Sequence, residues 1–141
     1  MSNGSLDGWV FHKNPEMLLD WQHRKNIIID ITRGLTYIHE ECRHKIFHSD
    51  IKPQNILLDE NFNAKVSDFG LSKLVDCEQS QVVTTMRGTP TYMASEWLNS
   101  VITEKVDVYS FGCIVLLEIL YGRKNVDHFK LEEAMHLLDL F

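Results

Sequence analysis

The first clear pattern of apolar residues runs through residues 20–41. Four apolar side chains recur at intervals of four, four and three residues: Ile27, Ile31, Leu35 and Ile38. This spacing places them on one face of an α-helix. Asp20 precedes the pattern and is a favourable N-cap residue, so the sequence predicts an amphipathic helix that runs to about Glu41.

Short strand patterns follow this helix. They lie at residues 45–48, 56–58 and 64–67. Turn-forming residues at 59–63 separate the last two, which suits a β-hairpin. Residues 71–92 are polar, rich in Ser and Thr, and show no clear period. We therefore expect a long loop there, and a loop of that length in a compact domain is usually functional.

A second helix is predicted from about Thr103 to Tyr121, with Gly122 in the position that commonly follows a helix. Apolar residues lie on most of its sides, which is typical of a helix buried in a core. They are Val106, Val108, Phe111, Ile114, Val115, Leu116 and Ile119. A third helical pattern, at residues 131–140, runs into the end of the chain. A domain does not normally stop inside such a pattern, so we expect the chain to be part of a longer domain.

The composition is that of one packed soluble domain. Of the 141 residues, 44% are hydrophobic and 24% are charged, whereas a disordered tail contains fewer apolar residues. The formal net charge of -6 argues against nucleic acid as a partner, because phosphate binding depends on clustered Lys and Arg. The cysteines and histidines show no paired metal-ligand spacing. The most apolar stretch, 113–117, is too short to cross a membrane, so we expect a cytoplasmic location for the chain as given.

Residues suited to phosphoryl transfer lie between the two long helices. Residues 48–55 read HSDIKPQN. They supply a carboxylate at Asp50, a cation at Lys52 and an amide at Asn55, and a second carboxylate, Asp68, follows the third predicted strand. Phosphoryl transfer needs a group that orients the attacking hydroxyl, oxygen ligands for magnesium, and positive charge near the moving phosphoryl group. These four side chains can supply all three.

This arrangement resembles the catalytic loop and the Asp-Phe-Gly motif of protein kinases. The resemblance implies that Asp50 is the catalytic base and that Lys52 steadies the γ-phosphate of ATP. It also implies that Asn55 and Asp68 are ligands of Mg²⁺ and that Leu57 lies under the adenine. A Lys two residues after the catalytic Asp is the pattern of the serine/threonine kinases.

The end of a kinase activation segment is the next motif that the chain resembles. Residues 87–96 read RGTPTYMASE. The resemblance implies that Thr89 contacts Asp50 and Lys52 and helps to shape the site for the substrate hydroxyl.

Residues 107–112, DVYSFG, resemble the start of the buried central helix of a kinase lobe. This implies that Asp107 anchors the backbone of loop 48–55. The alternative for Asp107 is an ordinary acidic residue in the first turn of a helix, where the helix dipole favours it. We also expect His48 to pack against Phe69.

At finer grain the chain resembles plant receptor-like serine/threonine kinases of the S-domain (G-type lectin) group. The stretches that carry this resemblance include MSNGSLD at 1–7, GLTYIHE at 34–40, DIKPQNILLD at 50–59 and AKVSDFGLS at 64–72. The implied fold is the C-terminal lobe of the kinase-like α+β fold, mainly α with a small β-hairpin and with the N-terminal lobe absent. Residues 1–141 then form a partial kinase domain, with a catalytic loop at 48–55 and an activation segment at 68–96.

The same resemblance implies the cofactors and partners. They are ATP, Mg²⁺ and a protein substrate that carries a Ser or Thr hydroxyl. It also implies a parent protein that is a single-pass receptor in the plasma membrane, with a cytosolic kinase domain.

Two departures from the family pattern bear on activity. Ser49 stands where many kinases carry an Arg that pairs with a phosphate on the activation segment, so we do not expect regulation through such a pair. Before Asp50 the sequence contains neither a Gly-rich loop nor a Val-Ala-x-Lys strand, the parts that grip the phosphates of ATP. The alternative to an active kinase region is therefore a truncated, catalytically incompetent module that binds partners.

Overall fold

The computed structural model describes residues 1–11, 14, 16 and 18–121 of the chain. Helix α2 (Trp21–Thr36) forms where the apolar spacing predicts it, and a π-helical turn, η2 (Tyr37–Glu41), continues it. The Asp20 carboxylate accepts a hydrogen bond from the His23 N–H at 2.8 Å, which satisfies one of the free donors at the helix start. The predicted apolar face is buried through Ile27, Ile31 and Leu35.

The second predicted helix is present as three consecutive pieces: α3 (Lys105–Tyr109), the π-helical turn η6 (Ser110–Val115) and α4 (Leu116–Tyr121). Its buried residues are Val106, Asp107 and Ser110 before the middle of the π-turn, and Val115, Glu118 and Ile119 after it. In the π-helical turn η6 the backbone hydrogen bonds span five residues, whereas they span four in an α-helix. The π-turn therefore takes up one extra residue and keeps both halves of the helix facing the core.

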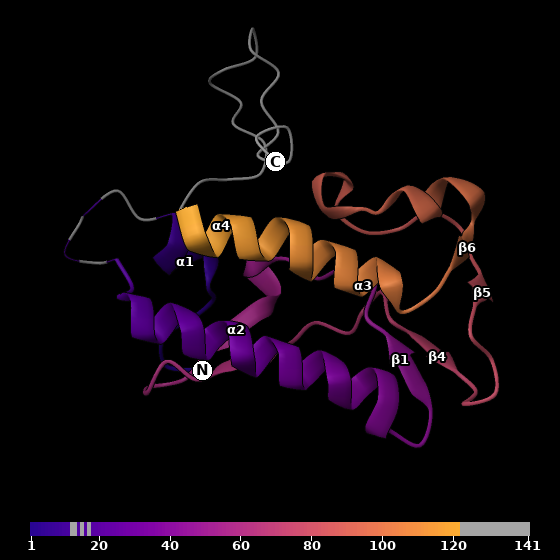
Figure 1. Ribbon diagram of the computed structural model, residues 1–141, viewed down its shortest axis with the longest axis horizontal. Helices are drawn as coiled ribbons and strands as arrows, with labels where there is room; N and C mark the ends of the chain where they lie inside the picture. Colours follow the sequence, from indigo (N-terminus) through magenta and orange to yellow (C-terminus); the bar gives the residue numbers. More distant parts are fainter. Residues whose placement is uncertain (12–13, 15, 17, 122–141) are drawn as a thin grey trace, which may run out of the picture.

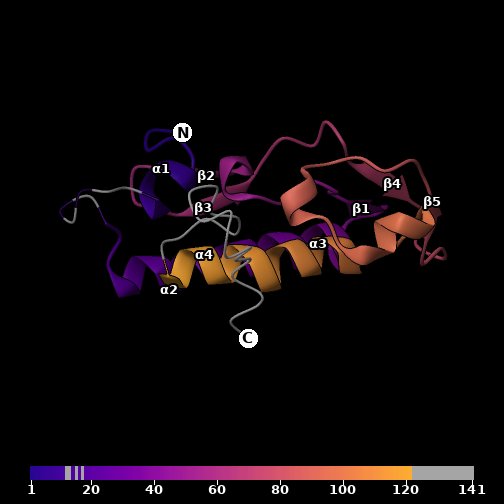
Figure 2. The same ribbon diagram turned by 90° about the horizontal axis from the view of Figure 1, so that it is seen from above.

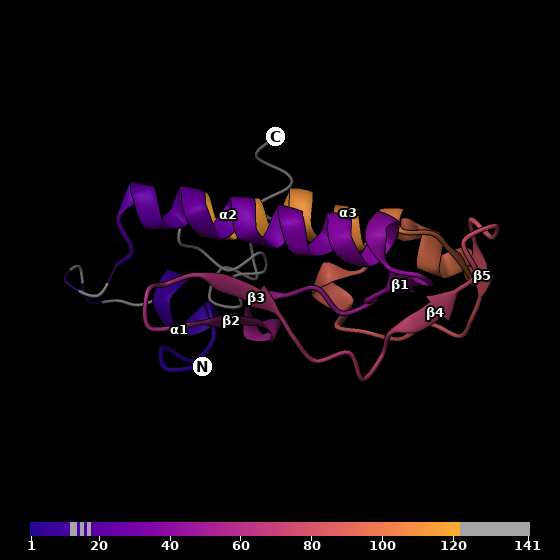
Figure 3. The same ribbon diagram turned by 90° about the horizontal axis from the view of Figure 1, so that it is seen from below.

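The two long helices lie side by side and form one layer of the molecule (Figure 1). A second layer lies on one side of them, as Figure 2 and Figure 3 show from opposite directions. It contains a short helix and four strands: α1 (Asp7–Val10), β1 (Lys45–Phe47), β2 (Ile56–Leu58), β3 (Ala64–Val66) and β4 (Lys73–Val75). Short 3-10 turns complete the described elements: η3 (Pro53–Asn55), η4 (Pro90–Tyr92) and η5 (Ser95–Asn99).

The predicted hairpin is confirmed. Strands β2 and β3 pair antiparallel, with Ile56 opposite Val66 and Leu58 opposite Ala64. The N-terminal segment lies along the other edge of β2, where the Leu6 N–H bonds to the Ile56 carbonyl at 2.8 Å. This pairing covers the edge of the hairpin that carries one end of loop 48–55.

The expectation of a small hairpin with a long loop at 71–92 is incomplete, because the described residues form two further ladders. Strand β4 falls inside that segment and pairs antiparallel with β1, and β5 (Val82–Val83) pairs with β6 (Val101–Ile102). Both ladders join strands that lie far apart in the chain. A polar segment can form them because backbone groups make the bonds, and two- or three-residue strands need no alternation of side chains.

Two apolar clusters form the core. The larger lies between the helices, α1 and the hairpin: its buried members are Leu6, Val10, Leu19, Ile27, Ile31, Leu35, Ile38, Ile51, Ile56, Leu58, Ala64, Val115 and Ile119. The smaller lies under the end of the segment 68–96: its buried members are Phe47, Val75, Ala94, Trp97, Ile102 and Val106. Loop 48–55 runs from one cluster to the other, because Phe47 belongs to the smaller and Ile51 to the larger.

Two sequence-based expectations fall outside the described residues, namely the helical pattern at 131–140 and the role of Gly122. Among the helices that the structure does describe, none combines the length and the apolar character that crossing a membrane requires.

Candidate active site

One buried carboxylate holds the start of loop 48–55. Asp107, in the first turn of α3, is 1% exposed. Its Oδ2 accepts a hydrogen bond from the His48 N–H at 2.7 Å, and its Oδ1 accepts one from the Ser49 N–H at 2.7 Å. The anchoring role predicted for Asp107 is therefore confirmed, and Asp107 also lies in the first turn of α3, where the helix dipole favours an acidic residue.

A third donor to Asp107 was not foreseen. The His39 Nε2 lies 2.8 Å from Asp107 Oδ2, and both side chains are buried. Because a carboxylate only accepts hydrogen bonds, Nε2 is the donor. His39 belongs to the π-helical turn η2, and the sequence offered only one weak signal for it: a polar residue beside Ile38 on the buried face of the helix.

His48 joins the loop to the end of strand β3. Its Nδ1 accepts a hydrogen bond from the Asp50 N–H at 3.2 Å, so the proton of the neutral ring lies on Nε2, which donates to the Ser67 carbonyl at 2.7 Å. The ring also packs edge-on against Phe69, with centroids 4.9 Å apart. The predicted contact between His48 and Phe69 is thus confirmed.

The Asp50 carboxylate is the centre of a bonded group. Thr89 Oγ1 donates to Asp50 Oδ1 at 3.0 Å, and the Lys52 ammonium lies 3.1 Å from Asp50 Oδ2. Lys52 also donates to Thr89 Oγ1 at 2.7 Å, which closes the triangle. The structure therefore brings the three residues together as predicted, although Thr89 is 39 positions away from Asp50 in the chain.

Asn55 and Asp68 present the oxygen atoms that a hard cation needs. The Asn55 Nδ2 donates to the Asp50 carbonyl at 2.9 Å and to its Oδ2 at 3.1 Å, which leaves the amide oxygen to accept from elsewhere or to coordinate. Ser67, the residue before Asp68, donates from its N–H to the Asn55 carbonyl at 2.8 Å, which joins the two segments that carry Asn55 and Asp68. The Asp68 carboxylate is exposed.

This donor set fits Mg²⁺. The ion prefers oxygen ligands and is commonly held by one or two carboxylates together with phosphate oxygens of the substrate. Within the described part of the chain, no three side chains of His, Cys, Asp or Glu gather into a metal cage. A site completed by substrate phosphates is consistent with that finding.

Gly88 allows the segment that carries Thr89 to pass close to the loop. Its φ is +111°, and a Cβ at this position would lie 2.8 Å from the Ser49 carbonyl oxygen. Ser49 itself is buried and has a φ of 70°. Gly88 belongs to the motif at 87–96, but its place in that motif gives no sign of this contact.

A second buried carboxylate supports the same segment. The Tyr92 hydroxyl bonds to both carboxylate oxygens of Glu118, at 2.9 Å and 3.0 Å, and Glu118 is fully buried in α4. Burial raises the pKa of Tyr92 well above its usual value, and the neighbouring Glu118 charge raises it further. Ser110 donates to the Tyr92 carbonyl. The sequence offered no sign of the pairing between Tyr92 and Glu118.

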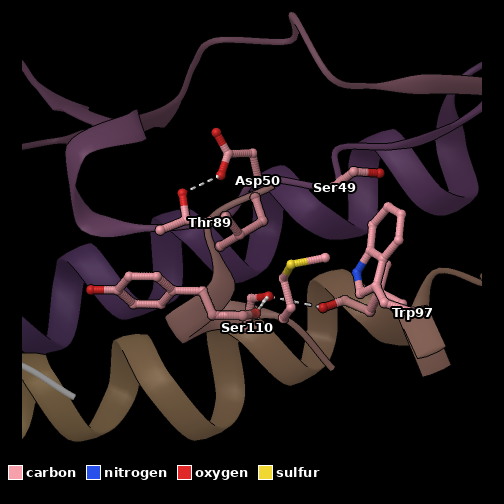
Figure 4. Close-up of a pocket in the computed structure, with 9 residues that line it drawn as sticks. Ser49, Asp50, Thr89, Trp97 and Ser110 are labelled. Atoms are coloured by element: carbon pink, nitrogen blue, oxygen red, sulfur yellow. Dashed lines mark hydrogen bonds between the residues drawn. The ribbon is translucent and has the colours of Figure 1, made fainter. Parts of the chain in front are cut away.

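Several of these residues line a small hollow beside Asp50 (Figure 4). Ser49, Asp50 and Thr89 lie on one side, and Trp97 and Ser110 on the other; Tyr92 also lines the hollow. Leu57 is elsewhere: it lies in β2, half-buried, and pairs with Lys65 of the hairpin and with Ser5. The arrangement can accept a proton at Asp50, supply positive charge at Lys52, and bind a cation at Asn55 and Asp68.

The chain is similar to known proteins along most of its length. Residues 1–138 match the family model described as protein kinase domain. The chain is 56% identical over 138 residues to G-type lectin S-receptor-like serine/threonine-protein kinase SD2-5 of Arabidopsis thaliana, which covers 96% of this chain and 17% of that protein.

Two further relatives support the same assignment. One is G-type lectin S-receptor-like serine/threonine-protein kinase LECRK3 of Oryza sativa subsp. indica, 50% identical over 139 residues, which are 98% of this chain and 17% of that protein. The other is a probable receptor-like protein kinase of Arabidopsis thaliana, 48% identical over 139 residues, which are 94% of this chain and 30% of that protein. The chain thus spans less than a third of each of these relatives.

Proposed function

The chain belongs to the protein kinase family, among the receptor-like serine/threonine kinases, and from this premise we propose the roles of its site residues. Residues 48–55 are the catalytic loop and residues 68–96 the activation segment of a transferase that moves the γ-phosphate of ATP to a protein Ser or Thr hydroxyl. The observation that carries the proposal is the closed triangle of Asp50, Lys52 and Thr89. The described residues then correspond to the C-terminal lobe of a kinase domain.

Asp50 is the catalytic base of this proposal. An attacking hydroxyl donates a hydrogen bond to its carboxylate, which orients the hydroxyl and accepts its proton. Thr89 donates to the same carboxylate at 3.0 Å and so fixes its rotation. Lys52, 3.1 Å from Asp50, supplies positive charge beside the transferring phosphoryl group.

Asn55 and Asp68 are the proposed magnesium ligands, and Leu57 is proposed to lie under the adenine. When bound, Mg²⁺ neutralises charge on the phosphates of ATP. Two hydrogen bonds to Asp50 fix the Asn55 amide with its oxygen directed away from the base. The backbone of Asp68 has a φ of 58°. Its carboxylate is exposed to solvent, where the nucleotide would arrive.

Replacement of the base tests these roles. In the full-length kinase that contains this chain, Asp50→Asn should lower phosphate transfer to a protein substrate by a factor on the order of 10²–10⁴, the usual contribution of a general base. Asp76→Asn removes the same charge from an exposed position and should leave the rate within about twofold. An Asp50→Asn enzyme that matches the Asp76→Asn enzyme would overturn the proposal.

We also infer that the parent protein acts at the plasma membrane, with this domain on the cytosolic side. The support is the receptor-like description of its relatives. The location of a fluorescent fusion of the full-length protein checks it: fluorescence confined to the cell interior would contradict the inference.

A second candidate is a partner-binding module without transferase activity. Calorimetric titration of the 141-residue chain with Mg-ATP separates the two candidates. Micromolar binding would count against the module and in favour of a nucleotide-competent chain.

A further inference from the structure

Ser110 lies about one helical turn after Asp107 in the second long helix. It is the first residue of the π-helical turn η6 and is 7% exposed. Residues three positions apart share one face of a helix. From this face Asp107 holds the start of loop 48–55, and the Ser110 hydroxyl bonds to the carbonyl of Tyr92, in the segment 87–96. The same face of the helix therefore holds both segments that meet at the proposed base.

The Ser110 hydroxyl has one proton and two neighbouring carbonyl oxygens. Its Oγ lies 2.5 Å from the Tyr92 oxygen and 3.0 Å from the Val106 oxygen. The Val106 oxygen already accepts a bond from the Ser110 N–H, whereas the described residues supply no other donor to the Tyr92 oxygen. Two oxygen atoms at 2.5 Å repel each other unless a proton lies between them. The hydroxyl therefore donates to Tyr92, and its removal would leave that carbonyl without a donor.

The main chain of Tyr92 is connected to the site by two further hydrogen bonds. Its N–H donates to the Thr89 carbonyl at 2.9 Å, and the Thr89 hydroxyl donates to Asp50 Oδ1 at 3.0 Å. The turn η4 begins directly after Thr89 and ends at Tyr92. Ser110 and Thr89 both line the hollow beside Asp50 (Figure 4). A shift of the Tyr92 carbonyl would thus move Thr89 relative to the carboxylate of Asp50.

The other contact of Tyr92 does not replace this bond. Its hydroxyl bonds to the Glu118 carboxylate at 2.9 Å, which holds the far end of the ring. Two side-chain torsions separate the ring from the main chain, so this bond leaves the carbonyl freer to move than the direct bond from Ser110 does.

We propose that Ser110 is a positioning residue for phosphoryl transfer, which holds Thr89 at the carboxylate of Asp50 through the carbonyl of Tyr92. The inference rests on the proposed function, in which Asp50 is the catalytic base. Ser110 acts on that base through two other residues and makes no contact with the reacting atoms.

A double-mutant cycle in the full-length kinase that contains this chain tests the proposal. Ser110→Ala removes the hydroxyl and should lower kcat by about tenfold, because a misplacement of about 1 Å can cost up to roughly 10²-fold. Thr89→Val removes the bond to Asp50 at nearly constant side-chain volume. In the Thr89→Val enzyme, Ser110→Ala should lower kcat by less than about twofold, because effects that pass through one residue are not additive.

The KM for ATP supplies a second readout. The proposed magnesium ligands, Asn55 and Asp68, make no hydrogen bond with Ser110 or Tyr92 among the described residues. Ser110→Ala should therefore leave the KM for ATP within about twofold while kcat falls. Rates are referred to the concentration of folded enzyme, which urea unfolding of each variant determines.

Thr32→Val is the matched control, because it removes a hydroxyl that bonds to the carbonyl four residues back in a helix, at an exposed position. It should leave kcat within about twofold. A Ser110→Ala enzyme with the kcat of the control would overturn the proposal. So would an equal fall of kcat in the wild-type and Thr89→Val backgrounds, which is the result for a residue that only stabilises the fold.

The same assay of Asp50→Asn separates this inference from the proposed function. If Asp50→Asn keeps its rate, the proposed function fails and the inference fails with it. If Asp50→Asn loses its rate while Ser110→Ala keeps its own, the proposed function stands and only the role of Ser110 is wrong.

Discussion

At the scale of single residues, the site depends on close backbone approaches as much as on side chains. Ser49 and Asp68 both adopt positive φ, a conformation that side chains other than those of Asn, Asp and Gly take rarely. Asp107 holds the first of these turns through the Ser49 N–H. Gly88 then passes within van der Waals distance of the Ser49 carbonyl, which brings Thr89 to Asp50.

Gly88→Ala should separate Thr89 from Asp50. The added Cβ would lie 2.8 Å from the Ser49 carbonyl oxygen, and a φ of +111° is strained for any L side chain. We expect the chain to lose about 1–3 kcal/mol of unfolding free energy in urea, and the full-length kinase to lose transfer rate. Gly8→Ala is the matched control, because nothing lies within 4 Å of its Cβ. Equal stability of the two variants would contradict the close approach.

Tyr92→Phe should destabilise the fold because Glu118 loses a hydrogen-bond donor in a fully buried place. The expected cost is about 1–3 kcal/mol in urea unfolding. Tyr37→Phe removes the same hydroxyl from a side chain that is 56% exposed and should change stability by less than about 0.5 kcal/mol.

The stability difference between wild type and Tyr92→Phe should also depend on pH. The pKa of Tyr92 is raised in the folded chain by burial and by the Glu118 charge, so the stability it contributes is complete below its ordinary pKa of about 10. That stability is lost as the pH rises above this value, because the unfolded chain ionises first. The stability difference between wild type and Tyr92→Phe should shrink between about pH 10 and pH 11. A difference independent of pH over that range would show that Tyr92 is not shielded.

Sequence reasoning at this scale found the residues that belong to a motif and missed those that act through packing. Asp50, Lys52 and Thr89 could be singled out because the segments 48–55 and 87–96 resemble motifs of protein kinases. His39 and Glu118 were not, because a polar residue on a helix face carries no sign of its partner until the helices are packed.

At the scale of elements, the two π-helical turns distinguish this chain from a simple helical pattern. Hydrophobic periodicity located both long helices, but it assumed 3.6 residues per turn throughout. In η6 the backbone turn is one residue wider than a turn of α-helix. The hairpin was predictable because its strands are neighbours in sequence. The pairings of β1 with β4 and of β5 with β6 were not, because each joins strands that are far apart in the chain.

Deletion of Gly112 should be tolerated. The π-turn η6 holds one residue more than an α-helix needs, so its removal should give a continuous α-helix with Val115, Glu118 and Ile119 still facing the core. No neighbour lies within 4 Å of a Cβ at Gly112. We expect a change of less than about 1.5 kcal/mol in the free energy of unfolding, the range of conservative changes in a core.

The control for this experiment is a deletion in a regular α-helix. Removal of Ile29 from α2 would turn Ile31 and Leu35 about 100° away from the core. That variant should not fold. If both deletions unfold the chain, the inference that η6 takes up one extra residue locally is wrong.

At the scale of the whole molecule, the two apolar clusters divide the chain into parts of different size. The larger cluster draws on α1, α2, the hairpin and the second long helix, whereas the smaller depends on short ladders and one Trp. Composition predicted a packed domain, yet it could not show this division, because the membership of Val75 and Ile102 in one cluster follows from non-local pairing.

The smaller cluster should open before the larger one. In hydrogen exchange on the folded chain, the ladder amides of β5 and β6 should exchange at least tenfold faster than those of β2 and β3, since two-residue strands bury little apolar surface. Trp97→Ala should accelerate exchange in β6 and leave the hairpin unchanged. Uniform acceleration over both ladders would show that the two clusters unfold together.

The way Asp107 holds the loop affects how proteins of this kind can evolve. Asp107 holds main-chain N–H groups of His48 and Ser49, so this contact does not depend on the side chain of Asp50. If Asp50 is the base proposed above, a lineage can exchange it for another residue, lose the transfer activity and keep the contacts of Asp107 to the loop. In a protein of this architecture, a single codon change can therefore separate an enzyme from an inactive protein of the same fold.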